Sequence, residues 1–273
     1  MIRVSGLFLH PVKSLRGFPV DRANVDDLGL EGDRRFLVID DAGKFLTQRT
    51  VPRMARVATA LCEEFLHLSE QDAGSITVPL APDTRADLRP VTVWRDSGML
   101  AEDCGDDSAA WLGGVLGVPC RLVRIGPDFR RPVTRDHARP GDLLAFADGA
   151  PLLVTTMASL DELNRRIRGN GGDPVMMDRF RPNLVLEGTE PFAEDHWSTL
   201  EIAGVRFRSA GPCDRCVVTT ADPLTGQRGK EPLATLAKFR RDPDSPSSVL
   251  FGVNLIQESK SGQIAVGDPV RIA

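Results

Sequence analysis

Short runs of aliphatic and β-branched residues, bounded by glycine, aspartate or proline, recur along the whole chain. In the first half they include IRVSGLFLH, RFLVID, SITVPL, VTVW and CRLVRI, and in the second half PLLVTT, NLVLEG, LEIAGVRFRSA, VLFGVNLIQES and QIAVGDPVRIA. Runs of this length and composition are typical of β-strands. Turn signals around Gly43 and Gly204 predict two hairpins.

Helical periodicity is confined to three segments. Residues 107–117 predict one helix that stops at Gly117. A second is predicted from Ser159, because Glu162 follows three residues later and the two would form a capping box. Residues 230–241 predict the third, with proline in its first turn.

The stretch 125–142, IGPDFRRPVTRDHARPGD, is rich in proline, arginine and aspartate and has no clear period. Such a stretch is typical of a long loop or linker. The sequence therefore predicts a β-rich α+β fold with barrel-forming strands and a few helices, divided into residues 1–122 and residues 123–273.

Composition and charge argue against several classes of function. The chain has 273 residues and a formal net charge of −4, which argues against a general nucleic-acid binder. No apolar run approaches the roughly 20 residues of a membrane span. The N-terminus is typical of a first strand rather than an export signal, so we expect a cytoplasmic protein whose five cysteines form no disulfides.

The stretch GPCDRCVVTTADPLTG, residues 211–226, places Cys213 and Cys216 three apart around Arg215. Such a pair can be half of a zinc site, a redox pair or two buried small side chains. The other cysteines and the four histidines are scattered, so the second half of a zinc site is missing. The strand-like VVTT that follows fits a thioredoxin-type redox pair poorly. ADPLTG predicts that Asp222 forms a turn.

A thiolate is a soft ligand that suits a soft or high-valent metal, and Arg215 beside Cys216 would favour its ionised form. A single protein ligand implies that a cofactor supplies the others, and such a cofactor would need residues that bind its anionic groups. Candidates occur in three motifs: Lys13 and Ser14 in HPVKS, Arg34 and Arg35 in GDRRF, and Arg181 and Asn183 in RFRPN.

An ordered set of fragments now carries a family resemblance. The set is HPVKSLRGFPV, GLEGDRRFLVID, EDCGDDSAAWL, DRFRPNLVLEG, GPCDRCVVTTADPLTG, KEPLATLAKFRR, FGVNL and IAVGDPV. Together they resemble the MOSC family with its N-terminal β-barrel domain, and within it the mitochondrial amidoxime-reducing components and the bacterial YcbX-like proteins. The resemblance implies an N-terminal MOSC-type β-barrel in residues 1–122 and a MOSC β-barrel domain in residues 123–273.

The resemblance also implies a molybdenum–molybdopterin cofactor with Cys216 as the protein ligand to molybdenum. Cys213 is then a structural neighbour. The positions that match the family's cofactor contacts are Lys13, Ser14, Arg35, Arg181, Asn183, Asp214 and Arg215. Asp148 matches an acidic, catalytic position near the metal. The family places hydroxyl residues after that aspartate, whereas Gly149 and Ala150 follow here.

The implied activity is the reduction of N-hydroxylated compounds such as amidoximes, hydroxylamines and N-hydroxy bases. The chain has neither the C-x4-C-x2-C spacing of a plant-type iron–sulfur centre nor a G-x-G-x-x-G nucleotide fingerprint. We therefore expect an external reductase with a small electron carrier, such as a ferredoxin or a cytochrome b5-like protein. Two alternatives stay open: a sulfur or molybdenum-cofactor carrier with a persulfide on Cys216, and a barrel that binds a phosphorylated ligand such as pyridoxal phosphate.

Overall fold

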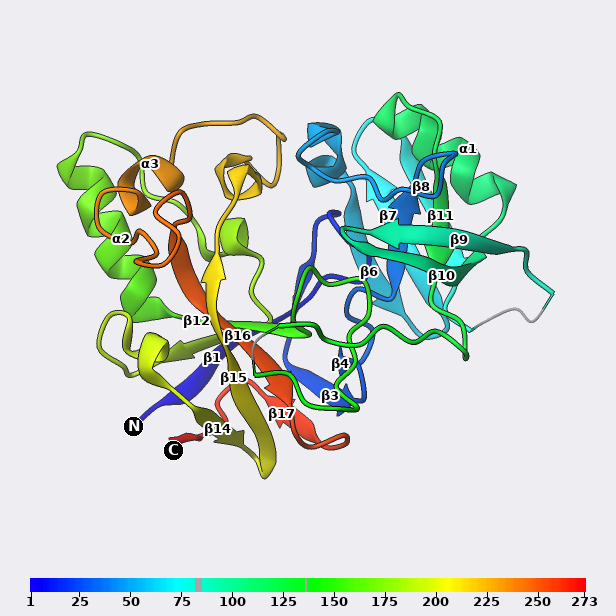
Figure 1. Cartoon of the computed structure of the whole chain (residues 1–273). Helices are drawn as coiled ribbons and strands as arrows, with labels where there is room; N and C mark the ends of the chain where they lie inside the picture. The colour runs from blue at the N-terminus through cyan, green and yellow to red at the C-terminus, as the bar shows by residue number, and fades with distance from the viewer. Residues whose placement is uncertain (82–84, 136) are drawn as a thin grey trace.

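The computed structural model describes residues 1–81, 85–135 and 137–273. Strands dominate this part of the chain, with three short α-helices, so the predicted β-rich α+β class is confirmed. Figure 1 shows two β-rich halves side by side, one carrying α2 and α3 and the other carrying α1. The segment that joins them crosses between the halves.

The larger half is built on an eight-stranded sheet in the order β18-β14-β15-β16-β12-β13-β1-β2. These strands are β1 (Arg3–Leu9), β2 (Phe18–Val20), β12 (Leu152–Thr156), β13 (Leu184–Glu187), β14 (Thr199–Ile202), β15 (Val205–Asp214), β16 (Leu250–Gln257) and β18 (Val270–Ile272). Neighbours are antiparallel except β12 and β13. The first two strands of the chain, β1 and β2, thus belong to a sheet whose other strands all come from residue 152 onward.

A small sheet also combines strands from the N-terminal and C-terminal parts of the chain. In it β17 (Gln263–Ala265) pairs with β3 (Arg22–Asp26), and β3 pairs with β4 (Gly29–Leu30). The division expected at residue 122 therefore does not separate the hydrogen-bonded sheets, because β1 and β3 each bond to a strand from beyond it.

The other half contains two sheets from the first 125 residues. One has the order β5-β11-β10-β9 and the other β6-β7-β8. Their strands are β5 (Phe36–Ile39), β6 (Ala58–Cys62), β7 (Phe65–Glu70), β8 (Gly74–Pro79), β9 (Leu88–Val93), β10 (Asp96–Asp103) and β11 (Arg121–Arg124). Helix α1 (Asp106–Leu116) packs against them through Leu112 and Leu116.

Two predicted helices differ in their ends. Helix α2 (Met157–Gly169) begins before Ser159, because the Thr156 side chain accepts a hydrogen bond from the Ser159 amide and caps the helix. The predicted capping box is therefore wrong. The Ser159 hydroxyl instead donates to buried Glu194. Helix α3 (Leu233–Leu236) is a single turn, much shorter than the predicted segment.

Residues 125–135 and 137–142 form no helix or strand, as the composition of this segment predicted. Buried Arg131 ties it to the next loop by donating to the carbonyl oxygens of Ala145 at 3.0 Å and Ala147 at 2.6 Å. The loop before β12 is thereby held against both halves. In the part of the chain that the structure describes, no helix has the length and apolar character needed to cross a lipid bilayer.

Replacing Leu7 by alanine tests the role of β1. Leu7 is fully buried between neighbours on β13 and β2, so Leu7→Ala should lower the free energy of unfolding by about 2–5 kcal/mol in denaturant titrations. Leu224, which is 69% exposed, is the matched control and should change it by less than about 0.5 kcal/mol. Equal effects of the two variants would contradict the placement of β1 in the core.

Candidate active site

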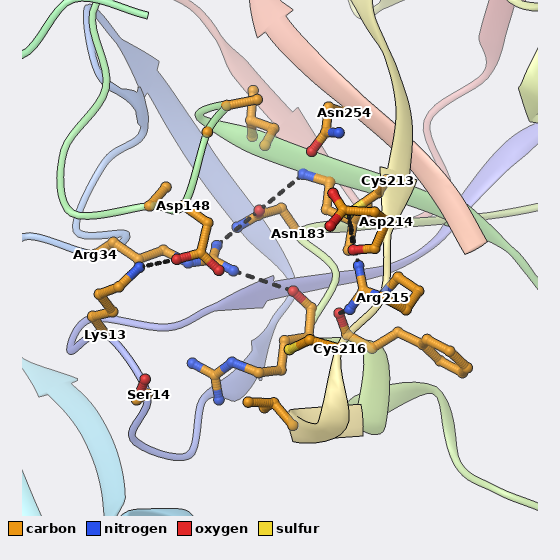
Figure 2. A pocket seen from close by; sticks show the side chains of 18 of the residues that line it. Lys13, Ser14, Arg34, Asp148, Asn183, Cys213, Asp214, Arg215, Cys216 and Asn254 are labelled. Carbon is orange, nitrogen blue, oxygen red and sulfur yellow. Dashed lines mark hydrogen bonds and ion pairs between the residues drawn. The ribbon is translucent and has the colours of Figure 1, made fainter. Parts of the chain in front are cut away.

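A cavity of about 550 Å³ lies between the two halves. From the first 125 residues of the chain, its wall contains Lys13, Ser14, Arg34, Thr47, Arg49 and Trp94. The second half contributes Arg135, residues 147–153, Phe180, Arg181, Asn183, residues 213–216, Val218, Thr219 and Asn254. Figure 2 shows the labelled side chains gathered around this space.

The cavity wall is strongly cationic. Its cations are Lys13, Arg34, Arg49, Arg135, Arg181 and Arg215, and its carboxylates are Asp148 and Asp214. This leaves a formal excess of four positive charges in a chain whose net charge is −4. Burial, and after it the neighbouring Arg34, lower the pKa of Arg181 to about 9.

Asp148 lies in the loop before β12. Its carboxylate accepts hydrogen bonds from two side chains of the first 125 residues of the chain. Oδ1 accepts from the Lys13 ammonium and, at 2.9 Å, from the Trp94 indole N–H. Burial alone would raise the pKa of Asp148, but Lys13 and Trp94 outweigh it and hold that pKa well below the usual range. Burial also lowers the pKa of Lys13, which Asp148 opposes. Asp148 is therefore a carboxylate at any ordinary pH.

A second network fixes Arg34, Arg181 and Asn183. Arg34 donates to the Asn183 side-chain oxygen at 2.8 Å and to the Arg181 carbonyl oxygen at 3.2 Å. Arg181 donates to the Leu15 carbonyl oxygen at 2.6 Å. Arg34 and Arg181 both adopt the left-handed region, with φ of 50° and 54°, so their guanidinium groups are aimed by backbone conformations that few side chains adopt. Asn183 acts as the buried centre of the network.

Arg35, one of the expected cofactor contacts, does not line this cavity. Its guanidinium turns away and makes two hydrogen bonds to Asp26, at 2.7 and 2.8 Å. The adjacent Arg34 lines the cavity in its place. Of the two arginines that the GDRRF motif indicated, Arg34 lines the cavity and Arg35 does not.

The Cys213–Cys216 segment leaves the end of β15 and runs along the cavity wall. Cys216 precedes a 3₁₀ turn, Val217–Thr220, and both cysteines line the cavity. Arg215 donates to the Cys213 sulfur at 2.9 Å and to the Phe180 carbonyl oxygen at 2.6 Å. The hydrogen bond from Arg215 to a cysteine sulfur thus goes to Cys213.

Hydrogen-bonding capacity is left over in the wall. The Nε atoms of Arg135 and Arg215 are buried and have no acceptor among the described residues. Buried guanidinium N–H groups of this kind are costly unless a ligand accepts from them. Within the same residues no group of three or more His, Cys, Asp or Glu side chains gathers for a metal. A metal at Cys216 would take its other ligands from a bound anionic cofactor, which is the group these residues fit.

Three comparisons with known proteins bear on this site. Residues 1–119 match the MOSC N-terminal beta barrel domain, and residues 142–271 match the MOSC domain. The mitochondrial amidoxime-reducing component 1 of Homo sapiens is 37% identical, over 98% of this chain and 82% of its own length. The chain belongs to the MOSC family. The resemblance read from its motifs is therefore confirmed.

Other relatives are more distant or longer. The molybdenum cofactor sulfurase of Danio rerio is 35% identical over 94% of this MOSC chain but only 32% of its own length. Among solved structures, the YuaD protein of Bacillus subtilis is 11% identical over 99% of this chain and 94% of its own, with a TM-score of 0.43.

Several wall residues were not predicted from the sequence. Arg49 stacks on Trp94, with its guanidinium carbon 4.4 Å from the ring centroid, and Arg135 enters from the segment before β12. Neither belonged to a motif. By contrast, the turn predicted at Asp222 is confirmed, because its carboxylate accepts from the amides of Leu224 and Thr225. Among the lysines of the described residues only Lys13 lines this cavity, and it is ion-paired with Asp148.

The Lys13–Asp148 pair predicts a titration. Because the folded pKa of Asp148 is depressed, the pair stabilises the protein above the unfolded value of about 4 and loses this contribution only as the pH falls through the folded pKa. In Lys13→Met the ion pair is lost, so the pKa of Asp148 should rise toward its unfolded value of about 4, as measured by carbon-13 NMR of labelled aspartate. Exposed Lys44→Met is the control and should leave Asp148 unchanged. A wild-type Asp148 that titrates near 4 would contradict this account.

Proposed function

We propose that this protein is a molybdenum-cofactor-dependent oxidoreductase that reduces N-hydroxylated compounds. The observation that carries the proposal is the cationic cavity with a thiol, Cys216, in its wall. Its MOSC domains and its relatives support a function related to the molybdenum cofactor. The name of the human relative supports the finer step to amidoximes and similar substrates.

The chain's own residues would hold the cofactor in distinct ways. Lys13, Ser14 and Arg34 would bind its phosphate and pterin, with Arg34 in the role that the resemblance implied for Arg35. Arg181, Asn183, Asp214 and Arg215 would complete the contacts. Cys216 would bind molybdenum through its thiolate, a ligand type that suits this metal.

The bound cofactor would supply a two-electron redox centre with an open coordination position for the substrate oxygen. Asp148 is the candidate catalytic residue beside it. Since its pKa is held far below neutrality, Asp148 is a hydrogen-bond acceptor rather than an acid, and its carboxylate would orient the N–H groups of an amidoxime. The side chains of Lys13 and Trp94, both from the first 125 residues of the chain, would hold this carboxylate in place.

Molybdenum content tests the proposal. Protein made in a host that synthesises molybdopterin should carry close to one molybdenum per chain by inductively coupled plasma mass spectrometry, and Cys216→Ala should lower this at least about tenfold, since the thiolate bond is lost. Cys213→Ala is the matched control, because Cys213 lines the same wall and accepts only from Arg215. It should retain most of the metal.

Two results would contradict the proposal. One is wild-type protein without molybdenum, and the other is an equal loss in both cysteine variants. Labile sulfane sulfur on Cys216 without molybdenum would favour a sulfur carrier instead, a role to which the likeness to the sulfurase also points.

Electron supply gives a second test of the proposed activity. Purified protein with cofactor should not reduce benzamidoxime with NADH alone, and should do so when a reductase and a small electron carrier are added. The reason is that the sequence has no fingerprint for a nicotinamide or flavin and no iron–sulfur spacing. Turnover with NADH as the sole addition would overturn the expectation of an external partner.

A further inference from the structure

Arg135 reaches the cavity from the irregular segment 125–142 and rests on the backbone of Gly149. A Cβ atom at position 149 would lie 2.5 Å from Arg135 Nε and 3.2 Å from its guanidinium carbon. Any larger residue at 149 would therefore displace the arginine. Gly149 does not have a positive φ, so what it provides here is space rather than backbone freedom.

The Arg135 guanidinium is only partly satisfied within the protein. Its nearest carboxylate contact is Nη2 to Asp214 Oδ1 at 3.6 Å, which is longer than a hydrogen bond. Its Nε is buried and has no acceptor among the described residues. Since Nε faces Gly149, the terminal nitrogens of the guanidinium are the ones that can donate to an anion in the cavity that Arg135 lines.

We propose that Arg135 is an anion-binding residue of this cavity, admitted by Gly149, and that its guanidinium binds an oxyanion of the ligand. The oxyanion has two possible sources, the phosphate of the proposed cofactor or a carboxylate on the substrate. The first source, and the substrate class in the second, rest on the proposed function.

The test uses full-length protein loaded with cofactor and measures how fast molybdenum and phosphate leave the chain during dialysis. Arg135→Ala should accelerate this loss about ten- to a hundredfold, the usual effect of removing one hydrogen bond to a charged group. Gly149→Ala should do the same by displacing Arg135. The double variant should be no worse than the more affected single variant, since both changes remove the same contact.

The matched control is Arg130→Ala. Arg130 lies in the same segment and donates only to the carbonyl oxygens of Pro127 and Phe129, so its loss should leave cofactor retention unchanged. Arg135→Gln retains bulk without charge and repeats the test if Arg135→Ala fails to fold. Additive effects of the Arg135 and Gly149 changes would overturn the proposed pairing.

Kinetics separate the two sources of the oxyanion. Unchanged retention, with a KM raised about tenfold for a carboxylate-bearing amidoxime and unaltered for its neutral analogue, would assign Arg135 to the substrate. Unchanged retention with both KM values unaltered would overturn the proposal.

A failure of the proposed function is distinguishable from a failure of this inference. If the wild type holds no molybdenum, calorimetric titration of the protein with inorganic pyrophosphate replaces the cofactor measurement. Binding that weakens about tenfold in Arg135→Ala, but not in Arg130→Ala, would support the inference. Equal binding by the wild type and Arg135→Ala, or no binding by the wild type, would overturn it.

Discussion

Six cationic side chains around one water-accessible cavity repel one another, and this repulsion is the constraint on which the rest of the site depends. Asp148 and Asp214 offset only part of it. Burial lowers the pKa values of Lys13 and Arg181, and the nearby Arg34 lowers both further, so their charged forms are disfavoured in this wall. A bound polyanion would relieve this repulsion, so the folded protein is organised for a ligand that brings negative charge.

The architecture keeps these cations in place by attaching them to both halves of the molecule. Lys13 follows β1, which is hydrogen-bonded into the sheet of the larger half, and Arg34 follows β4, which pairs with β3. Trp94 comes from the turn between β9 and β10 and reaches Asp148 before β12. Arg131 holds the loop that carries Asp148 through its backbone carbonyl oxygens. The cavity is therefore a property of the joined halves rather than of either alone.

The sequence predicted the features that depend on local composition and the site residues that lie in motifs. Strand composition indicated the β-rich class, and the ordered motifs brought Lys13, Ser14, Asp148 and Cys216 to one cavity. It did not predict which arginine of GDRRF faces inward, because that depends on the left-handed backbone of Arg34.

Contacts between distant segments were equally hidden in the sequence. Trp94 and Arg135 carry no motif and meet the site only through tertiary structure. The direction of Arg215, toward Cys213, follows from the path of the chain after β15 and not from its place beside Cys216.

Anomalous X-ray diffraction at the molybdenum absorption edge, from crystals of protein purified with its cofactor, is the most direct test of the central claim. The account predicts one strong peak inside the cavity that Lys13 and Arg34 line, within bonding distance of the Cys216 sulfur. A peak elsewhere, or molybdenum-replete protein whose peak does not touch Cys216, would contradict it.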